Sequence, residues 1–309
     1  MTYSLLRWLL TPFRYGAVSF YRGFFLRSAC IAVIKLFSKN RVLLTGLMEV
    51  RPVDRLDLSF VPSDSMVISE VFWFGVQGYE GMLASIWQNL CIHASHILEI
   101  GGNVGFYTVI GSKTSTTAYT VLEPVPEIAS VLNANLARNE IGHVVVLQAA
   151  AIPETLQQQV LLNVPDEGTL NPVGSHLVSG SEVSGRTSKK IIRVPGLPFH
   201  DLIQDCDLIK IDAEGLEFAL LTSAKQVIQT KRPTILIEVL PESVHLGTLL
   251  AELAETCNYF IHVIPAYGTH KITIIPASKF TSSVPRQYNS KDIILSCKKL
   301  NGAGTILNP

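Results

Sequence analysis

Apolar runs and amphipathic stretches alternate along the chain from His96 onward. Short apolar runs are typical of buried strands, and the stretches between them have the spacing of helices that pack on a sheet. This alternation predicts an α/β fold with a mostly parallel sheet covered by helices on both faces. The predicted parallel strands are Ile97–Ile100, Tyr119–Glu123, Val144–Gln148, Leu208–Asp212 and Ile235–Val239.

The helices predicted between and after these strands are Gly105–Ser112, Glu127–Asn139, Leu216–Thr230 and Ser243–Thr256. Pro126 fits the first turn of its helix, where a missing N–H costs no hydrogen bond, and Gly142 fits the turn that follows. The closing runs, Tyr259–Ile264 and Lys271–Ile275, leave no room for a crossover helix. We therefore expect an antiparallel hairpin with Gly268 in its turn, which makes seven strands in all.

The segment Ile152–Pro198 separates the third and fourth predicted strands and is rich in glycine and serine. Long loops inside a compact domain are usually functional or disordered. Open sheets bind ligands beyond the carboxyl ends of their strands, so this segment should begin above the ligand site. A substrate lid and a linker without a role are both compatible with the pattern.

The first 50 residues form a predicted extension, and residues 51–309 form the predicted catalytic domain. Arg7, Arg14 and Arg22 interrupt the apolar residues, so no run approaches the ~18 residues that span a bilayer. Their spacing places them on one helical face. A basic amphipathic extension is expected, either in peripheral contact with a membrane through residues 1–45 or packed on the domain or a second subunit.

The charge balance and the cysteines exclude several classes of function. Basic and acidic residues number 25 each, which gives no field that would attract nucleic acid, so no nucleic-acid partner is expected. The five cysteines are far apart and include no Cys-x-x-Cys pair, which argues against a zinc site or a disulfide framework. Reduced thiols suit a cytoplasmic protein, with the inner face of the membrane as a further possibility. No metal is predicted.

A glycine turn lies at the first junction between a predicted strand and a predicted helix. Glycines there let the backbone approach a ligand and expose helix N–H groups. An NAD fingerprint would need glycines at positions 103 and 106, so a dehydrogenase is disfavoured, and no triphosphate-binding loop occurs. The turn supplies the predicted cofactor-binding residues Glu99, Gly101, Gly102, Asn103, Gly105, Phe106, Tyr107 and Thr108.

Acidic residues end the second and fourth predicted strands. Glu123, followed by Pro124, is placed where an acid can accept hydrogen bonds from both ribose hydroxyls of an adenosine cofactor. Asp212 and Glu214 follow the fourth strand and should face the site or solvent, because unpaired buried acids are costly. Glu217 has a purely structural explanation as well, because an acid in the first turn of a helix is favourably placed. At the end of the third strand, Gln148, Ala149 and Ala150 are expected to flank the adenine.

These motifs resemble the FkbM family of S-adenosylmethionine (SAM)-dependent methyltransferases between Gln77 and about Glu238. The resemblance implies a Rossmann-like fold, SAM as cofactor, and O-methylation of hydroxyls in sugars, glycans or secondary metabolites. Glu99 stands where the family usually has Asp, and Gly102 where it usually has Ala. The stretches that carry the resemblance are Gly78-Tyr79-Glu80, Glu99 to Thr108, Leu122-Glu-Pro, Lys210-Ile-Asp-Ala-Glu-Gly-Leu-Glu and Arg232-Pro-Thr-Ile-Leu-Ile-Glu.

Within this resemblance, Glu80 and Asp212 join the predicted cofactor-binding residues, and Glu99 could accept from the amino group of the methionine moiety. Methyl transfer to a hydroxyl of a small molecule or glycan requires that the acceptor oxygen be aligned with the methyl group and that a base remove the hydroxyl proton. The candidate bases are Asp212 or Glu214, with Glu238 or His245 as alternatives. The same acids could instead hold a divalent cation. A non-catalytic subunit that docks a membrane or partner, and a divergent NAD-type oxidoreductase, are the competing functions.

Overall fold

A computed structural model describes residues 49–52, 54–153, 159–164, 176–177, 190–265 and 271–301 of the 309-residue chain. Residues 1–45, for which membrane contact is predicted, lie outside the described residues. So do Gly268 and much of the predicted loop between Ile152 and Pro198.

The central sheet has eight strands in the order β11-β10-β12-β9-β8-β1-β2-β3. All five predicted parallel strands are present, and their pairing is parallel from β9 through β3. Its strands are β1 (His96–Ile100), β2 (Ala118–Leu122), β3 (Val144–Leu147), β8 (Leu208–Ile211), β9 (Thr234–Glu238), β10 (Phe260–Ile264), β11 (Thr273–Ile275) and β12 (Asp292–Ser296). The mostly parallel α/β fold is therefore confirmed.

Strand β12 corrects the predicted count of seven strands. The predicted hairpin forms, with β10 antiparallel to β11, but β12 lies between β9 and β10 and is antiparallel to both. Pairing of Ile293 with Ile237 and with Val263 buries this last strand completely. Its partners lie far earlier in the chain, which the local hydrophobic pattern does not encode.

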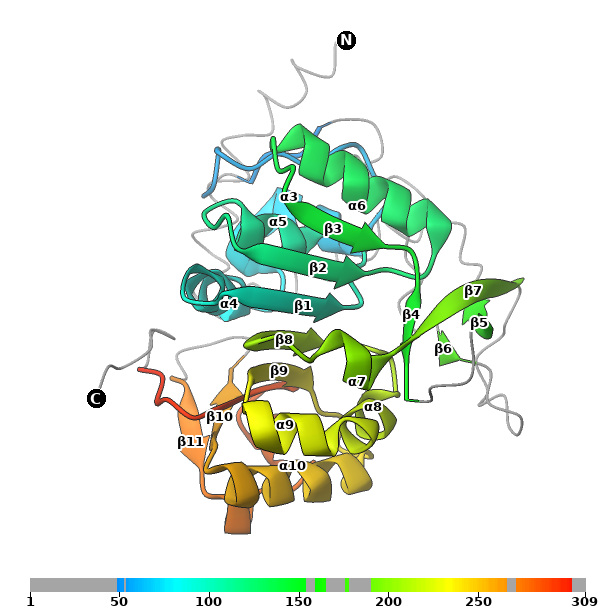
Figure 1. The fold of residues 1–309 in the computed structure, drawn as a ribbon. Coiled ribbons are helices and arrows are strands. Elements are labelled where there is room, and N and C mark those ends of the chain that lie inside the picture. Colours follow the sequence, from blue (N-terminus) through cyan, green and yellow to red (C-terminus); the bar gives the residue numbers. More distant parts are fainter. Residues whose placement is uncertain are drawn as a thin grey trace.

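Helices cover both faces of the sheet (Figure 1). Trp87, Phe106 and Tyr119 are buried on the face of α3 to α6, and Leu220 and Leu250 on the face of α7 to α10. The helices are α3 (Met66–Phe74), η2 (Val76–Gly78), α4 (Leu83–Ile92), α5 (Phe106–Ser112), α6 (Pro126–Arg138), α7 (Phe199–Leu202), α8 (Glu217–Ser223), α9 (Lys225–Lys231), α10 (Val244–Cys257), η3 (Ala277–Lys279) and α11 (Val284–Gln287). Within the described ranges, none of them combines the length and apolarity needed to cross a bilayer.

One predicted helix is split in two. The stretch predicted as Leu216–Thr230 forms α8 and α9, which meet at the non-helical Ala224. The hydroxyl of Ser223 donates to the carbonyl of Leu220 at 2.8 Å, a local bond that competes with helix continuation. Pro126 occupies the first turn of α6 as predicted.

The segment predicted as a long loop contributes strands instead. A second sheet has the order β4-β7-β5-β6, with β4 (Ala150–Ile152), β5 (Gln159–Val164), β6 (His176–Leu177) and β7 (Lys190–Pro198). Strands β5 and β7 pair antiparallel along the whole of β5. The glycines and serines at the centre of the segment concealed the β-branched runs at its two ends, so the loop prediction was wrong there.

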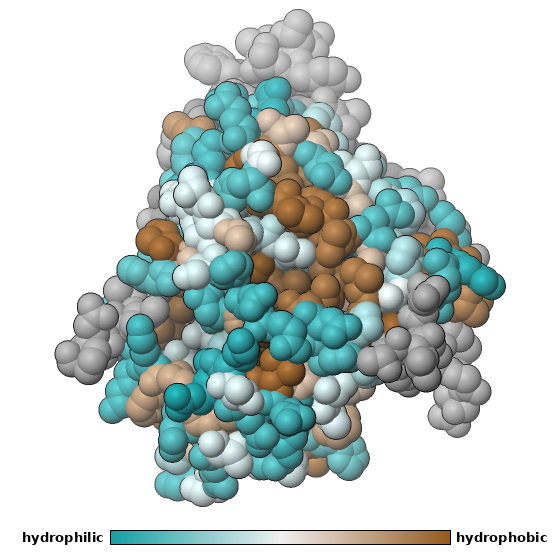
Figure 2. Space-filling view, viewed as in Figure 1, coloured by the Kyte–Doolittle hydropathy of each residue, from teal (hydrophilic) through white to brown (hydrophobic). Residues whose placement is uncertain are grey.

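The carboxyl ends of β1, β2 and β3 point toward the small sheet (Figure 1). The chain passes from β3 to β4 almost directly, and β3 is an edge strand that carries the half-exposed Val145. Apolar side chains show in the middle of this face of the molecule, ringed by hydrophilic ones (Figure 2). The small sheet thus stands beside the edge at which parallel strands present their ligands.

Candidate functional site

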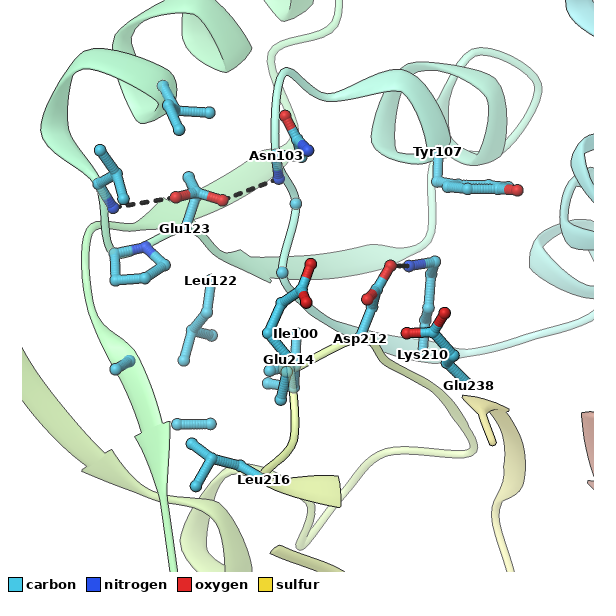
Figure 3. A pocket seen from close by; sticks show the side chains of 18 of the residues that line it. Ile100, Asn103, Tyr107, Leu122, Glu123, Lys210, Asp212, Glu214, Leu216 and Glu238 are labelled. Carbon is cyan, nitrogen blue, oxygen red and sulfur yellow. Dashed lines mark hydrogen bonds and ion pairs between the residues drawn. The ribbon is translucent and has the colours of Figure 1, made fainter. Parts of the chain in front are cut away.

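A cavity of about 300 Å³ lies at the carboxyl ends of the parallel strands. One end is apolar apart from the glycine turn and Glu123, and the other is charged (Figure 3). It is lined by Val67, Tyr79, Ile100 to Val104, Phe106, Tyr107, Leu122 to Val125, Ile128, Ala149 to Ala151, Leu162, Lys210, Asp212 to Glu214, Leu216, Glu238, Leu240 and Lys291.

The glycine turn is shaped by close backbone approach. The N–H groups of Gly101 and Gly102 both donate to the carbonyl of Leu122, at 3.0 and 2.9 Å. Gly101 has φ +81°, and a Cβ there would lie 2.1 Å from the carbonyl oxygen of Asp212. Only glycine fits this position, because both the dihedral angle and the space exclude a side chain. The turn therefore brings the ends of β1, β2 and β8 together.

Gly102 has a packing reason to differ from the usual Ala of the family. A Cβ at this position would lie 2.4 Å from Cγ2 of Val121 and 2.7 Å from Cδ1 of Leu132. Real Cβ atoms do not approach neighbours this closely, so an alanine would need both side chains to move. The departure is thus explained by the side chains behind the turn rather than by the ligand side.

Glu123 lies at the cavity wall directly after β2 and is 6% exposed. Its carboxylate accepts from the N–H of Asn103 and from the N–H of Val125, each at 2.9 Å (Figure 3). Burial raises the pKa of this carboxyl to about 7, with Asp212 and Glu99 adding to the rise and the two N–H donors opposing it. Each oxygen keeps a lone pair for a further donor.

This pKa predicts that ligand affinity depends on pH. If ribose hydroxyls donate to ionised Glu123, affinity is full above the pKa and falls as pH drops through about 7. Calorimetric titration with S-adenosylhomocysteine (SAH) should show about tenfold weaker binding at pH 6 than at pH 8. In Glu123→Gln, binding should be weaker at pH 8 and that part of the pH dependence should vanish. Glu127→Gln, an exposed acid paired with Lys190, is the control and should keep the wild-type profile. If SAH affinity depends on pH in Glu123→Gln as it does in the wild type, Glu123 does not bind the ribose hydroxyls.

Small residues after β3 leave space beside the turn. Ala149 and Ala150 line the cavity as predicted, together with Pro124 and with Leu162 of the small sheet. Gln148 is exposed and does not line the cavity. Gln148 follows the last residue of β3, Leu147, and so lies outside the strand.

Glu99 and Thr108 lie beneath the cavity instead of in it. The Glu99 carboxylate accepts from the Thr108 hydroxyl at 2.8 Å and from the Tyr119 hydroxyl at 2.6 Å, all through Oε2. Burial raises the pKa of Glu99, partly offset by Lys210. The other oxygen, Oε1, is buried and has no hydrogen-bond partner among the described residues, so the contact between Glu99 and a methionine amino group stays a prediction.

Lys210 and Asp212 form an ion pair at the charged end, with Nζ 3.1 Å from Oδ2 (Figure 3). Burial would raise the pKa of Asp212, but Lys210 and Lys291 hold it below its usual value. The Lys210 ammonium also lies 4.9 Å from the centre of the Tyr107 ring. The site thus contains a buried cation that sequence reasoning did not select, although a lysine between Ile209 and Ile211 in a buried strand was a visible signal.

Lys291 joins two acids at the same end. Its Nζ is 2.8 Å from Oε1 of Glu238 and 2.9 Å from Oε1 of Glu80. Glu238 lines the cavity as predicted, while Glu80 lies just behind Lys291 and accepts from the Tyr107 hydroxyl. Lys291 belongs to no local motif, so it could not be identified from the pattern of residues around it.

Of the remaining residues selected from the sequence, some line the cavity and others do not. Glu214 lines the cavity with φ +49°. Glu217 accepts from the N–H groups of Ala213 and Gly215 and closes the loop after β8, which is a structural role. His245 is exposed on α10 against the ring of Phe218 and does not line the cavity. Among the described residues, no group of three His, Cys, Asp or Glu side chains is placed to hold a metal ion.

The sheet order, the glycine turn and the acid after β2 define the class of Rossmann-like α/β methyltransferases. Residues 99–261 match the model of the Methyltransferase FkbM domain. The match covers more than half of the chain, so this chain belongs to the FkbM methyltransferase family, whose cofactor is SAM. A search among curated proteins found no match.

Solved structures that match part of this chain include several methyltransferases. Methyltransferase FkbM from Methylobacillus flagellatus KT is 16% identical, with a TM-score of 0.37, over 65% of this chain and 43% of that one. SAH-bound PaMTH1 from Podospora anserina is 13% identical, with a TM-score of 0.29, over 50% and 51%. An O-methyltransferase from Bacillus cereus in complex with SAH is 13% identical, with a TM-score of 0.33, over 69% and 79%. The matches thus span about half of the Methylobacillus and Podospora chains.

Proposed function

We propose that this protein transfers the methyl group of SAM to a hydroxyl of a sugar, a glycan or a secondary metabolite. The observation that carries the proposal is the composition of one cavity. Its apolar end holds the glycine turn and Glu123, and its other end holds Asp212, Glu214 and Glu238 beside two lysines. An adenosine-binding half and a proton-accepting half therefore adjoin.

The residues at the apolar end fit the cofactor. Gly101 and Gly102 line the cavity with backbone alone, and Glu123 presents a buried carboxylate with free acceptor capacity. Ala149, Ala150 and Ile128 provide an apolar wall suited to a flat base. These residues would hold the adenosine part of the cofactor. When bound, SAM supplies an electrophilic methyl group on a sulfonium.

Asp212 is the first candidate for the base. It lines the cavity with its side chain 32% exposed, and the ammonium groups of Lys210 and Lys291 lower its pKa, so it is ionised at neutral pH. An ionised carboxylate at this place can accept the proton that the hydroxyl loses as its oxygen gains the methyl group, a contribution of about 10²–10⁴-fold in typical enzymes. Glu214 and Glu238 line the same end and are tested beside it.

The proposed reaction is tested with SAM that carries a labelled methyl group. The purified protein should bind SAH, should not bind NAD, and should transfer label to at least one member of a panel of sugars, glycan fragments and phenolic metabolites. Products should gain about 14 daltons at an alkali-stable oxygen position. Transfer confined to nitrogen or sulfur acceptors would contradict the proposal that the acceptor is a hydroxyl. If the protein does not bind SAH, the proposal that it is a SAM-dependent enzyme is wrong.

A further inference from the structure

Lys291 is tied to the site through both its backbone and its side chain. Its carbonyl oxygen accepts from the N–H of Val239 at 2.7 Å, which fixes the residue beside the end of β9. Its ammonium then reaches Glu238 and Glu80 at 2.8 and 2.9 Å. Lys291 lies beyond residues 99–261, which match the family, so the family motif does not account for it.

Glu80 extends this connection behind the cavity. Its side chain is only 8% exposed, and its backbone has φ +52°, an unfavourable conformation for a residue with a side chain. Its second carboxylate oxygen accepts from the hydroxyl of Tyr107, whose ring lies under the ammonium of Lys210. Backbone strain is retained where surrounding contacts over-determine it, and here those contacts are Lys291 and Tyr107.

Acids outnumber lysines in this cluster. Five carboxyl groups, those of Glu80, Glu99, Asp212, Glu238 and Asp292, lie within electrostatic reach of the two ammonium groups of Lys210 and Lys291. Burial raises the pKa of Asp292 well above its usual range, Glu80 adds to the rise, and Lys291 opposes it. The titratable groups that interact with Lys291 are Tyr79 and Glu80 after η2, Asp212 after β8, Glu238 on β9 and Asp292 on β12. Tyr107 and Lys210 contact Glu80 and Asp212 from the far side.

We propose that Lys291 is a positioning residue of the transfer reaction, whose ammonium ties Glu238 and Glu80 together at the wall of the cavity that Asp212 also lines. This inference rests on the proposed function, in which Asp212 is the base that accepts the proton of the acceptor hydroxyl. Lys291 is, after Lys210, the largest positive influence that holds the pKa of Asp212 down against burial. Removing it takes away one of the two positive charges that lower the pKa of Asp212, so protonation of Asp212 becomes easier.

The charge effect can be measured without cofactor or acceptor. In protein labelled with carbon-13 at aspartate carboxyls, the Asp212 resonance is assigned from Asp212→Asn and titrated in the wild type, Lys291→Met and Lys291→Arg. The midpoint should rise by about 1–2 pH units in Lys291→Met and stay near the wild-type value in Lys291→Arg. Lys225→Met, which removes an exposed ion pair with Glu252, should leave it unchanged. An unmoved midpoint in Lys291→Met would overturn the proposal.

Kinetics on the full chain tests the consequence for transfer. With a member of the acceptor panel that takes up label from SAM, the acidic limb of the kcat profile of Lys291→Met should move to higher pH by the same interval, with SAH affinity within about twofold of wild type. Lys291→Arg should restore the profile. A higher KM for acceptor with an unchanged profile would mean that Lys291 binds the acceptor directly, and the positioning role would be wrong.

A second variant covers the case in which Lys291→Met does not fold. Lys291→Met combined with Glu80→Gln removes one charge of each sign, so the net charge of the cluster stays constant while Glu238 loses its partner. This double variant should show the same upward movement of the acidic limb, and a wild-type limb would contradict the proposal. Failure of the proposed function would appear differently, as absence of SAH binding and transfer in the wild type.

Discussion

Asp212→Asn is expected to lower kcat by about 10²–10⁴-fold while leaving the protein folded. Asparagine keeps the shape of the side chain but loses the negative charge that Lys210 and Lys291 stabilise in the native site. The KM for SAM should change by much less than kcat, because the interaction that is lost is made with the departing proton. Initial rates at saturating SAM, combined with thermal unfolding and SAH titration of the same preparation, measure this outcome.

The other carboxylates at this end provide the comparison. Glu214→Gln and Glu238→Gln change residues that line the same cavity, so either could show a smaller loss. Asp201→Asn changes an exposed acid on α7 and should retain wild-type rates. If Asp212→Asn stays active while Glu214→Gln or Glu238→Gln is inactive, the base is the other carboxylate. If all three keep full activity, none of them is the base.

Gly101→Ala is expected to lower the free energy of unfolding by about 2–5 kcal/mol. The added Cβ would meet the carbonyl oxygen of Asp212 at 2.1 Å, and the alanine would have to adopt φ +81°. To remove this clash, β1 and β8 must move apart at the point where the glycine turn meets Asp212. SAH affinity should therefore fall by more than tenfold even where the variant remains folded, as measured by denaturant unfolding and by calorimetry.

Alanine substitutions at two other glycines distinguish the cost of the positive φ from the cost of the steric clash in Gly101→Ala. Gly215 has φ +102° with nothing within 4 Å of an added Cβ, so Gly215→Ala should show the dihedral cost alone, about 1 kcal/mol. Gly142 has open space and no positive φ, so Gly142→Ala should stay within about 0.5 kcal/mol of wild type. Equal stability of Gly101→Ala and Gly142→Ala would show that the turn does not require glycine.

Features that depend on local sequence were predictable. The glycine turn, Glu123 and Asp212 were identified because strand ends, turn glycines and acids beside them lie within a few residues of one another. The parallel strands were found because buried strands must be continuously apolar. The orientation of a side chain was less accessible, as Glu99 shows, since it lies within the motif yet points beneath the cavity to Thr108 and Tyr119.

Features that depend on distant partners were not predictable from the pattern. Strand β12 and the pairing of β5 with β7 were missed because their hydrogen bonds join segments that local periodicity treats separately. Lys291 looks like any exposed lysine in the sequence, yet the insertion of β12 beside β9 carries it to Glu238 and Glu80.

The sequence by itself determined the α/β class, the order of the parallel strands and the position of the glycine turn, because each follows from periodicity and from conformations that few residue types can adopt. The tertiary structure decided which charged groups meet. Ion pairing in a buried site depends on distances of a few ångströms between residues far apart in the chain, and only the folded sheet brings Lys210, Asp212, Glu238 and Lys291 to one cavity.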